Sequence, residues 1–453
     1  MNKYLYRFIC AVILITSATV EFAYVWLRFV RVHNQTGSLL GKGNIIMALA
    51  AYALLLSVNG YWLKAFKVGV ERKAKVIASV ILTVFSTDVT EILVSMAITG
   101  QFRFFWAFTW RYAILAIGQS VTLLVLTSCM VDLYRTIIPP LTVLEIVGHY
   151  KNNLAEELNG IKNKYIIKET IHYIDKHVFE KINLYDAVLI NDIPAYAEKD
   201  IVKVCFERDK RVYLVPKLSD IIIKSSDDIN VVDTPLFLCR NLGISMPKAF
   251  IKRAVDLILS TLSLIVLSPL FLVVAIAIKH EDGGPVFFKQ ERVTYKEKRF
   301  MILKFRSMIV DAEKDGRPHP AGERDDRITR VGRVIRATRI DELPQLINII
   351  KGDMSIVGPR PERWEHVEKY MQEIPEFKYR YKVKGGLTGY AQVYGKYNTS
   401  ALDKLKMDLM YITNYRLLLD VQIVFETVKI LFLKESTEGF DQNSIDEMHN
   451  SVK

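Results

Sequence analysis

The chain has 453 residues, of which 51% are hydrophobic, and it carries a formal net charge of +12 at pH 7. That length is too great for one compact core, so two or three domains are expected. A strongly basic balance suits nucleic acid, anionic lipid headgroups or a phosphorylated substrate. The sequence has no motif of a nucleic-acid-binding module, and its long apolar segments favour the other two partners. Its four cysteines are scattered, which argues against a zinc site and a disulfide framework.

Four apolar windows occupy the first third of the chain, over residues 6–30, 44–63, 76–98 and 104–130. Each has the roughly 20 mostly apolar residues that a membrane-spanning helix needs. The first lacks a convincing small-residue cleavage site, so we expect a retained helix rather than a signal peptide. The second connection is rich in lysine and arginine, and the positive-inside rule then places the N-terminus and everything after the fourth window in the cytoplasm. The first connection is also basic, which weakens that assignment.

Two carboxylates lie inside the third window. Asp88 and Glu91 are three residues apart and therefore share one helical face. Carboxylates buried in lipid are costly and are candidates for function by default. A pair that is satisfied inside the helix bundle, without a specific role, is the alternative that the sequence leaves open.

Residues 141–245 change character, because short β-rich runs alternate with polar stretches of helix-compatible length. That alternation predicts a small α/β domain with a parallel sheet. The first run ends at Gly148, where a dinucleotide site would place its glycine-rich turn. The following residues offer no second or third glycine for a pyrophosphate to approach. We therefore predict a degenerate Rossmann-like module with a structural or regulatory role.

A fifth apolar stretch runs over residues 254–278, after the basic pair Lys252 and Arg253. Ser268 and Pro269 interrupt it near its middle, where a proline removes a helical hydrogen bond and clashes with the preceding turn. A bent helix that enters one leaflet and returns would keep both flanks on the same side of the membrane. A kinked helix that spans the bilayer is the alternative, and the residues alone leave both open.

Two basic clusters follow that suit phosphate. Lys304 and Arg306, in the run KFRSM, are two apart, so on an extended segment they point the same way. A solvated basic strand is the alternative for such a pair. Further along, five arginines recur at intervals of three and predict a stripe along one helical face, suited to anionic headgroups or a diphosphate. They are Arg327, Arg330, Arg333, Arg336 and Arg339.

Asp341 and Glu342 close this arginine stripe. Adjacent carboxylates point to different sides, so they would divide labour rather than share a proton. One could attack phosphorus and form an acyl-phosphate, while the other acts as a base or a metal ligand. Mg²⁺ would be held by one carboxylate together with substrate oxygens. Taken in isolation, the pair would be an ordinary surface feature.

Two loops complete the candidate site. Pro359 and Pro361 stiffen the backbone around Arg360, which reduces the entropy lost when its guanidinium binds a ligand. Gly358 permits a close approach of the backbone. A rigid loop between helices is the alternative. The run KGGLTGYAQVYG, residues 384–395, predicts a flexible loop that covers a site or lies at the membrane surface.

In this order, the motifs PVFFKQERV, KFRSM, RITRVGR, DELPQLIN, KGDMSIVGPRP and GLTGYAQV resemble the bacterial sugar transferase family of polyprenyl-phosphate phosphoglycosyl transferases. The resemblance covers residues 252–433, and the preceding part resembles the large members of that family. It implies a membrane protein of α and α/β parts. Four transmembrane helices would occupy residues 1–136, a Rossmann-like domain 137–247, a mainly helical catalytic domain 248–435 and a polar tail 436–453.

The resemblance further implies a two-step reaction. Asp341 would attack the β-phosphate of a UDP-sugar and release UMP, and undecaprenyl phosphate would then take the phosphosugar. Glu342 would assist, and Mg²⁺ would sit beside Asp341. The residues implied to bind the substrate are Lys304, Arg306, Arg336, Pro359 and Arg360.

The resemblance also favours a re-entrant helix over residues 254–278, kinked at Ser268 and Pro269. The site would then face the cytoplasm at the bacterial inner membrane, in contact with membrane lipids and with room for a homodimer. One departure stands out, because the family commonly has proline–glycine where this chain has Gly385 and Gly386. We expect that change to loosen the loop without removing a reacting group.

Two other functions remain open from the sequence. An inactive scaffold or regulator of glycan assembly would keep the fold, but the intact Asp341–Glu342 pair and its flanking motifs argue against it. A transporter of lipid-linked glycans would usually show two matching membrane halves, which four spans and one broken helix do not supply. No segment encodes a readable pocket for one sugar.

Overall fold

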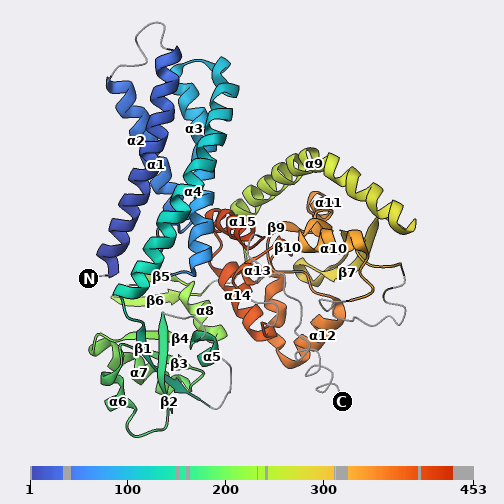
Figure 1. The fold of residues 1–453 in the computed structure, drawn as a ribbon. Helices are drawn as coiled ribbons and strands as arrows, with labels where there is room; N and C mark the ends of the chain where they lie inside the picture. The colour runs from blue at the N-terminus through green and yellow to red at the C-terminus, as the bar shows by residue number, and fades with distance from the viewer. Residues whose placement is uncertain are drawn as a thin grey trace. The chain divides into compact units, whose positions relative to one another are not determined.

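The computed structural model describes residues 3–33, 42–148, 154–159, 164–231, 233–239, 243–310, 312, 325–395 and 399–431. The chain divides into two compact units, Met1–Val215 and Pro216–Lys453, which are described separately (Figure 1). The three domains expected from the sequence, with boundaries at residues 136 and 247, stay a prediction.

The first unit begins with long apolar helices. They are α1 (Lys3–His33), α2 (Lys42–Trp62), α3 (Lys73–Thr99) and α4 (Phe105–Ile137), with a 3-10 turn, η2 (Phe102–Phe104), before α4. In length and composition these helices meet the requirement for crossing a bilayer, as does one helix of the second unit. The expectation of a membrane protein with long apolar helices is therefore supported, while the number that cross stays a prediction.

Asp88 and Glu91 both face the interior of this helix bundle and are buried. The Tyr52 hydroxyl lies 3.0 Å from the Asp88 carboxylate and 3.0 Å from the Gln119 amide oxygen. Ser95 donates to Glu91 at 3.4 Å. One oxygen of each carboxylate thus has a polar neighbour inside the bundle, as the satisfied-pair alternative requires, whereas the second has no partner among the described residues.

The rest of the first unit is a four-stranded parallel sheet with short helices, in agreement with the predicted α/β arrangement. Its strand order is β2-β1-β3-β4. The strands are β1 (Leu141–Val147), β2 (Tyr165–His172), β3 (Ala187–Asn191) and β4 (Arg211–Leu214). The helices are α5 (Leu154–Asn159), α6 (Val178–Lys181) and α7 (Ala195–Glu207), with the 3-10 turn η3 (Ile182–Leu184). Every residue of β3 is buried, as expected for a central parallel strand.

Close packing of the backbone explains the glycine at position 148. A Cβ atom there would lie 2.0 Å from the carbonyl oxygen of Asp192, at the turn after β3. The glycine is therefore required by the approach of two turns at the sheet edge. This explains a single glycine at that position without any need for a bound pyrophosphate.

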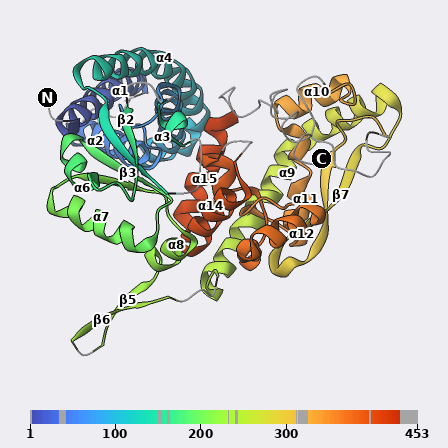
Figure 2. The same cartoon turned by 90° about the horizontal axis from the view of Figure 1, so that it is seen from below.

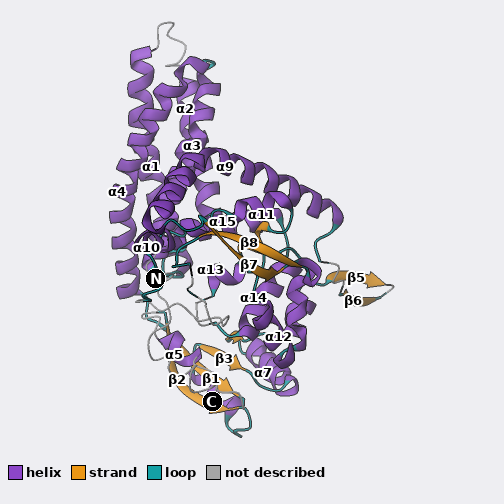
Figure 3. Ribbon diagram, turned by 90° about the vertical axis from the view of Figure 1, so that its right-hand side faces the viewer, coloured by secondary structure: helices purple, strands orange, loops and turns teal. Residues whose placement is uncertain are grey.

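The second unit is mainly helical, as predicted (Figure 3). Its helices and 3-10 turns are α8 (Leu218–Lys224), α9 (Met246–Asp282), η4 (Tyr295–Glu297), α10 (Arg330–Ala337), η5 (Ile340–Glu342), α11 (Gln345–Lys351), α12 (Trp364–Glu373), η6 (Pro375–Lys382), α13 (Tyr390–Tyr394), α14 (Ala401–Thr413) and α15 (Leu417–Leu431). Its strands are β5 (Asp227–Val231), β6 (Thr234–Leu238), β7 (Phe287–Val293), β8 (Arg299–Phe305), β9 (Ser355–Val357) and β10 (Gly386–Thr388).

These strands form three small pairs. β5 with β6 (Figure 2) and β7 with β8 are antiparallel hairpins, and β9 with β10 is parallel. A small core under the β7–β8 hairpin includes Phe300 and Ile302 of β8 and Leu346 and Ile349 of α11. The hairpin and α11 are therefore fixed against each other, and both lead to the candidate site.

Helix α9 is one continuous helix, drawn as an arch in Figure 1. It extends past both ends of the apolar stretch 254–278 and contains Pro269 without a break in the helix. Ser268 donates to the carbonyl oxygen of Ile265 at 2.8 Å. Gly283 follows the helix in the left-handed conformation, φ 70°, and its N–H donates to the carbonyl oxygen of Lys279.

The N-terminal part of α9 is bound firmly to the rest of its unit. Lys252 pairs with buried Asp420 at 2.6 Å. Asp256 accepts from the Ser355 hydroxyl at 2.7 Å and from the N–H of Ile356 at 3.1 Å. Arg253 donates to two carbonyl oxygens at the end of α11. The basic pair that precedes the apolar stretch in the sequence thus has a structural role here.

Candidate active site

Strand β8 presents Lys304 to the candidate site. Its Nζ donates to the Oε1 atom of Glu342 at 2.8 Å, with the two side chains 19% and 12% exposed. Burial lowers the pKa of Lys304, and Arg360 adds to this effect while Glu342 opposes it. The ammonium group of Lys304 has three N–H donors, and Glu342 takes one of them, so a further anion could also bind to it.

A single tight turn, η5, carries both acidic residues. Arg339, just after α10, has a left-handed backbone with φ 58°, which changes the direction of the chain. The N–H of Glu342 donates to the carbonyl oxygen of Arg339. Leu343 then bonds back to Ile340, and α11 follows after Pro344. The two carboxylates are therefore held on one short turn between two helices.

Asp341 and Glu342 have different electrostatic surroundings. Burial raises the pKa of Asp341, with Lys304 and Arg336 opposing that rise. Burial alone would also raise the pKa of Glu342, but Arg360 and Lys304 outweigh it and hold that pKa well below its usual range. Glu342 is thus fixed as an anion, whereas the Asp341 carboxylate makes no hydrogen bond with another residue in the described part of the chain. The expected division of labour has a physical basis in this difference.

Arg360 reaches the same carboxylate oxygen as Lys304. Its Nη2 donates to Glu342 Oε1 at 2.9 Å. The loop that carries it is held against β10, because the carbonyl oxygen of Pro359 accepts from the N–H of Gly386 at 2.9 Å. A Cβ on Gly358 would lie 2.3 Å from the carbonyl oxygen of Lys384. The glycine therefore allows two backbones to pack together rather than a ligand to approach.

The departure at Gly385 has a structural consequence. The N–H of Gly385 donates to the hydroxyl of buried Thr294 at 3.0 Å. A proline at this position would have no N–H to donate. This hydrogen bond helps hold the loop in place, which offsets part of the loosening expected from the sequence.

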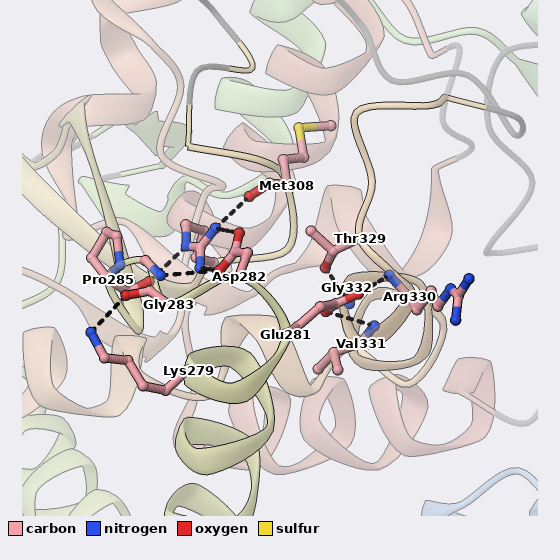
Figure 4. A network of polar contacts seen from close by, with 12 residues as sticks. Lys279, Glu281, Asp282, Gly283, Pro285, Met308, Thr329, Arg330, Val331 and Gly332 are labelled. Atoms are coloured by element: carbon pink, nitrogen blue, oxygen red, sulfur yellow. Dashed lines mark hydrogen bonds and ion pairs between the residues drawn. The ribbon is translucent and has the colours of Figure 1, made fainter.

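Arg306 does not join this group. It forms an ion pair with Asp282, at the end of α9, and donates to the carbonyl oxygen of Pro285 at 2.6 Å and of Met308 at 3.2 Å (Figure 4). No contact links it to Asp341 or Glu342 within the described residues. Lys304 contacts Glu342 whereas Arg306 contacts Asp282, so the two basic side chains have different partners. The N–H of Arg306 still bonds to the carbonyl oxygen of Val286, and a substrate-binding role for Arg306 stays a prediction.

Only part of the predicted arginine stripe lies on a helix. Helix α10 begins at Arg330, so only the middle three of the five arginines lie on it. Arg327 precedes the helix and pairs with Asp325 at 2.6 Å, and Arg339 lies beyond its end. Arg336 is the member of the helix that opposes the rise in the pKa of Asp341 caused by burial. The prediction of one continuous helical face is therefore wrong at both ends.

The start of α10 is fixed by α9. The Glu281 carboxylate accepts from the N–H groups of Arg330 at 2.7 Å and Val331 at 3.2 Å (Figure 4). The Thr329 hydroxyl accepts from Gly332 at 2.9 Å. Together these bonds satisfy the first free N–H groups of the helix. Since α10 leads directly to η5, the cap also fixes where Asp341 lies.

A small cleft of about 10 Å³ opens beside Lys304 and Arg360. Its other lining residues are Arg292, Ile302, Gln345, Pro361 and Gly386. Arg292 donates to the carbonyl oxygen of Pro361 at 3.2 Å, and burial together with the nearby Arg360 lowers its pKa to about 10. Sequence reasoning quoted the motifs that contain Arg292 and Gln345 but singled out neither residue. Gln345 lies close to Glu342 in the sequence, and Arg292 has only its place in the motif PVFFKQERV as a signal.

The side chains here suit a magnesium ion held mainly by substrate. Within the described residues no cluster of three histidine, cysteine or acidic side chains is present. Mg²⁺ is often bound through one or two carboxylates and substrate phosphates, so such a cluster is not required. One oxygen of Glu342 is already shared by Lys304 and Arg360. Asp341 is therefore the carboxylate that fits this role.

Comparison with known proteins places these residues in a family. The model of the bacterial sugar transferase family matches residues 247–434. A UDP-N-acetylgalactosamine-undecaprenyl-phosphate N-acetylgalactosaminephosphotransferase of Aeromonas hydrophila is 45% identical over 196 residues, which are 42% of this chain and 46% of that protein. A UDP-glucose:undecaprenyl-phosphate glucose-1-phosphate transferase of Klebsiella pneumoniae is 34% identical over 302 residues, 64% of this chain and 63% of that protein.

A shorter relative is matched over most of its length. The protein of Caulobacter vibrioides, also named UDP-glucose:undecaprenyl-phosphate glucose-1-phosphate transferase, is 38% identical over 229 residues, 48% of this chain and 85% of that protein. The match to the two longer relatives spans only 46% and 63% of their length. The family resemblance seen in the sequence is confirmed, and the chain belongs to the bacterial sugar transferase family.

Proposed function

We propose that this protein transfers a sugar 1-phosphate from a UDP-sugar to undecaprenyl phosphate and releases UMP. The observation that carries the proposal is the Asp341–Glu342 turn, in which Lys304 and Arg360 both hold Glu342 beside a basic cleft. The names of the relatives describe the same class of transfer. Such a reaction would be the first membrane step in the synthesis of an exopolysaccharide or a related glycan.

The proposed chemistry has two displacements at one phosphorus atom. A carboxylate oxygen of Asp341 attacks the β-phosphorus of the donor, and the bond to the oxygen that bridges to the α-phosphate breaks, so UMP leaves with that oxygen. The phosphosugar remains on Asp341 as an acyl-phosphate. An oxygen of undecaprenyl phosphate then attacks the same phosphorus and frees the carboxylate. The product is a lipid-linked diphosphosugar.

The neighbouring side chains have distinct roles in this scheme. Lys304 and Arg360 stabilise negative charge on the phosphoryl group as it transfers. Glu342 holds these two cations in place, because its single Oε1 atom accepts from both. Arg336 keeps the pKa of Asp341 lower than burial alone would make it, which favours the nucleophilic carboxylate. Mg²⁺, held by Asp341 and the donor phosphates, would neutralise the diphosphate.

The shape of α9 supports a re-entrant membrane helix. Its two ends bind the same unit, through Lys252 and Asp256 at one end and Glu281 and Asp282 at the other. Between them it exposes large apolar side chains, including Ile265 and Val266. A helix that crossed the bilayer would separate its ends, so we infer that α9 enters one leaflet and returns. The site would then lie at the cytoplasmic face of the bacterial inner membrane.

The first unit would add a membrane region of four spans and a degenerate Rossmann-like module. The helices α1 to α4 have the length and hydropathy for spans. The strand order β2-β1-β3-β4, with all pairs parallel, is compatible with such a module. We assign it a structural or regulatory role rather than catalysis.

The proposed activity can be tested directly in membranes. Membranes containing the full chain are incubated with a panel of radiolabelled UDP-sugars, Mg²⁺ and undecaprenyl phosphate. UMP release and label in the organic phase should rise together for at least one sugar. Membranes with Asp341→Asn at the same protein level serve as the control. Absence of turnover across a broad panel would overturn the proposal.

A further inference from the structure

Thr294 is a buried residue just after strand β7, and its hydroxyl joins two other segments of the unit. The residue is only 3% exposed and has an extended backbone. Its Oγ1 atom donates to the carbonyl oxygen of Asp353 at 2.9 Å and accepts from the N–H of Gly385 at 3.0 Å. Asp353 lies just before β9 and Gly385 just before β10. One hydroxyl therefore links the β7–β8 hairpin to both strands of the β9–β10 pair.

The two residues before this threonine contact the loop 358–362, which carries the arginine of the candidate site. Arg292 donates to the carbonyl oxygen of Pro361 at 3.2 Å. The N–H of Val293 donates to the carbonyl oxygen of Glu362 at 3.1 Å. The end of β7 is thus bound both to the loop itself and to the two strands on either side of it in the sequence.

Gly385 lies directly against the same loop. A Cβ atom at this position would lie 2.6 Å from the Cγ atom of Pro361 and 3.4 Å from the carbonyl oxygen of Pro359. The N–H of Gly386 donates to that oxygen of Pro359 at 2.9 Å. Pro359 and Pro361 flank Arg360, so a shift of Gly385 would also move the arginine.

The two cations of the candidate site reach one carboxylate oxygen from different parts of the chain. Lys304 lies on β8, where it is paired with Phe288 of β7, and it donates to Glu342 Oε1 at 2.8 Å. Arg360 donates to the same atom from its loop at 2.9 Å. The separation of the two cations therefore depends on how the hairpin is attached to the loop.

We propose that Thr294 is a positioning residue for the transfer: its hydroxyl fixes the β7–β8 hairpin against the β9–β10 pair and thereby sets the separation of Lys304 and Arg360. The inference rests on the proposed function, in which these two cations stabilise charge on the phosphoryl group as it transfers. Thr294 itself touches neither substrate nor nucleophile. Because such stabilisation is realised in the transition state, loss of the hydroxyl should lower kcat and leave the KM for the donor nearly unchanged.

The variants Thr294→Val and Thr294→Ser separate the hydroxyl from the volume of the side chain. Valine has a similar shape but no hydrogen-bonding group, whereas serine keeps the hydroxyl. Steady-state UMP release is measured with the full chain in membranes, at a temperature at which each variant is folded. We expect Thr294→Val to lower kcat by about tenfold or more, with KM within about twofold of the wild type. Thr294→Ser should keep both parameters within about twofold.

Thr413→Val is the matched control, because the hydroxyl of Thr413 bonds to the carbonyl oxygen of Leu409 within its own helix α14. This variant should keep the wild-type kcat and KM. If valine at position 294 prevents folding, Thr294→Cys is the second variant, since its thiol is a weaker donor and acceptor. Its kcat should lie below that of Thr294→Ser. Wild-type kcat in folded Thr294→Val or Thr294→Cys would overturn the inference.

A double variant distinguishes positioning from a general loss of structure. Glu342→Gln already weakens the hold on the two cations, so adding Thr294→Val to it should lower kcat by less than about twofold further. An equal loss of kcat in both backgrounds would show that Thr294 acts elsewhere and would also overturn the inference.

Hydrogen exchange separates this inference from the proposed function. Amide exchange in the peptides that contain the loop 358–362 and β10 should be faster in Thr294→Val and unchanged in Thr294→Ser. If the wild type transfers phosphosugar and Thr294→Val keeps its kcat, the positioning role is wrong and the proposed function stands. If no UDP-sugar is turned over but exchange in both peptides depends on the hydroxyl, the proposed function is wrong and the link through Thr294 stands. Unchanged exchange in Thr294→Val would contradict the link, whatever the activity.

Discussion

Arg380 donates from Nη2 to the backbone carbonyl oxygen of Arg360 at 3.0 Å. Arg380 is itself only 1% exposed, and it pairs with equally buried Asp408 of α14 at 2.8 Å. The loop that presents the Arg360 guanidinium is therefore supported from behind by a buried ion pair. Neither Arg380 nor Asp408 touches the candidate nucleophile, so their role is to position the loop.

We expect Arg380→Met to destabilise the protein by about 3–5 kcal/mol, because it leaves the Asp408 carboxylate buried without its cation. Burial already raises the pKa of Asp408 to about 6. The double variant Arg380→Met with Asp408→Asn should recover part of that loss. Thermal unfolding in detergent measures both, and exposed Arg416→Met is the control. A double variant less stable than Arg380→Met alone would contradict this account.

Asp341→Asn should reduce the label trapped on protein from a radiolabelled donor to background, because an amide oxygen cannot replace the carboxylate nucleophile. Glu342→Gln should slow trapping by roughly 100-fold without abolishing it, since it weakens the hold on Lys304 and Arg360. Trapping is followed by electrophoresis in the absence of lipid acceptor. Undiminished trapping in Asp341→Asn would show that another residue is the nucleophile.

The pH dependence of trapping should depend on Lys304. Asp341 must be ionised to attack, and burial raises its pKa while Lys304 opposes the rise. Trapping should therefore fall as the pH drops through that raised pKa. Lys304→Met removes the opposing charge, so the acid limb of the pH–rate profile should move to higher pH. An acid limb that stays in place or moves lower would contradict the prediction, and Lys351→Met is the control.

Arg306→Met and Asp282→Asn should have matching effects, because each breaks the same ion pair. We expect both to lower the unfolding temperature and to leave the KM for the donor near the wild-type value. The comparison requires steady-state kinetics and thermal unfolding of the two variants side by side. A raised KM in Arg306→Met alone would restore the substrate-binding role predicted from the sequence.

The sequence was sufficient to choose Lys304, Glu342 and Arg360, which the structure brings together at one carboxylate oxygen. It also predicted the parallel sheet of the first unit and a mainly helical second unit. These succeed because apolar periodicity and short-range motif order are local properties. The meeting of Lys304 with Arg360 depended on family resemblance, since no local pattern links residues so far apart.

Other features depend on where elements end, which the sequence specifies poorly. Arg306 pairs with Asp282 at the end of α9, a contact that no local sequence pattern predicts. The arginine stripe is interrupted because Glu281, distant in the chain, caps α10 at Arg330.

The two ends of helix α9 hold other elements of its unit in place. Arg253 binds the carbonyl oxygens that end α11, and Glu281 binds the N–H groups that begin α10. These two short helices flank the turn that carries Asp341. A water-soluble version made by deleting the helix would therefore lose both caps and misplace the acid. Replacing only its outward-facing apolar side chains, such as Ile265 and Val266, is the route that leaves the fold intact.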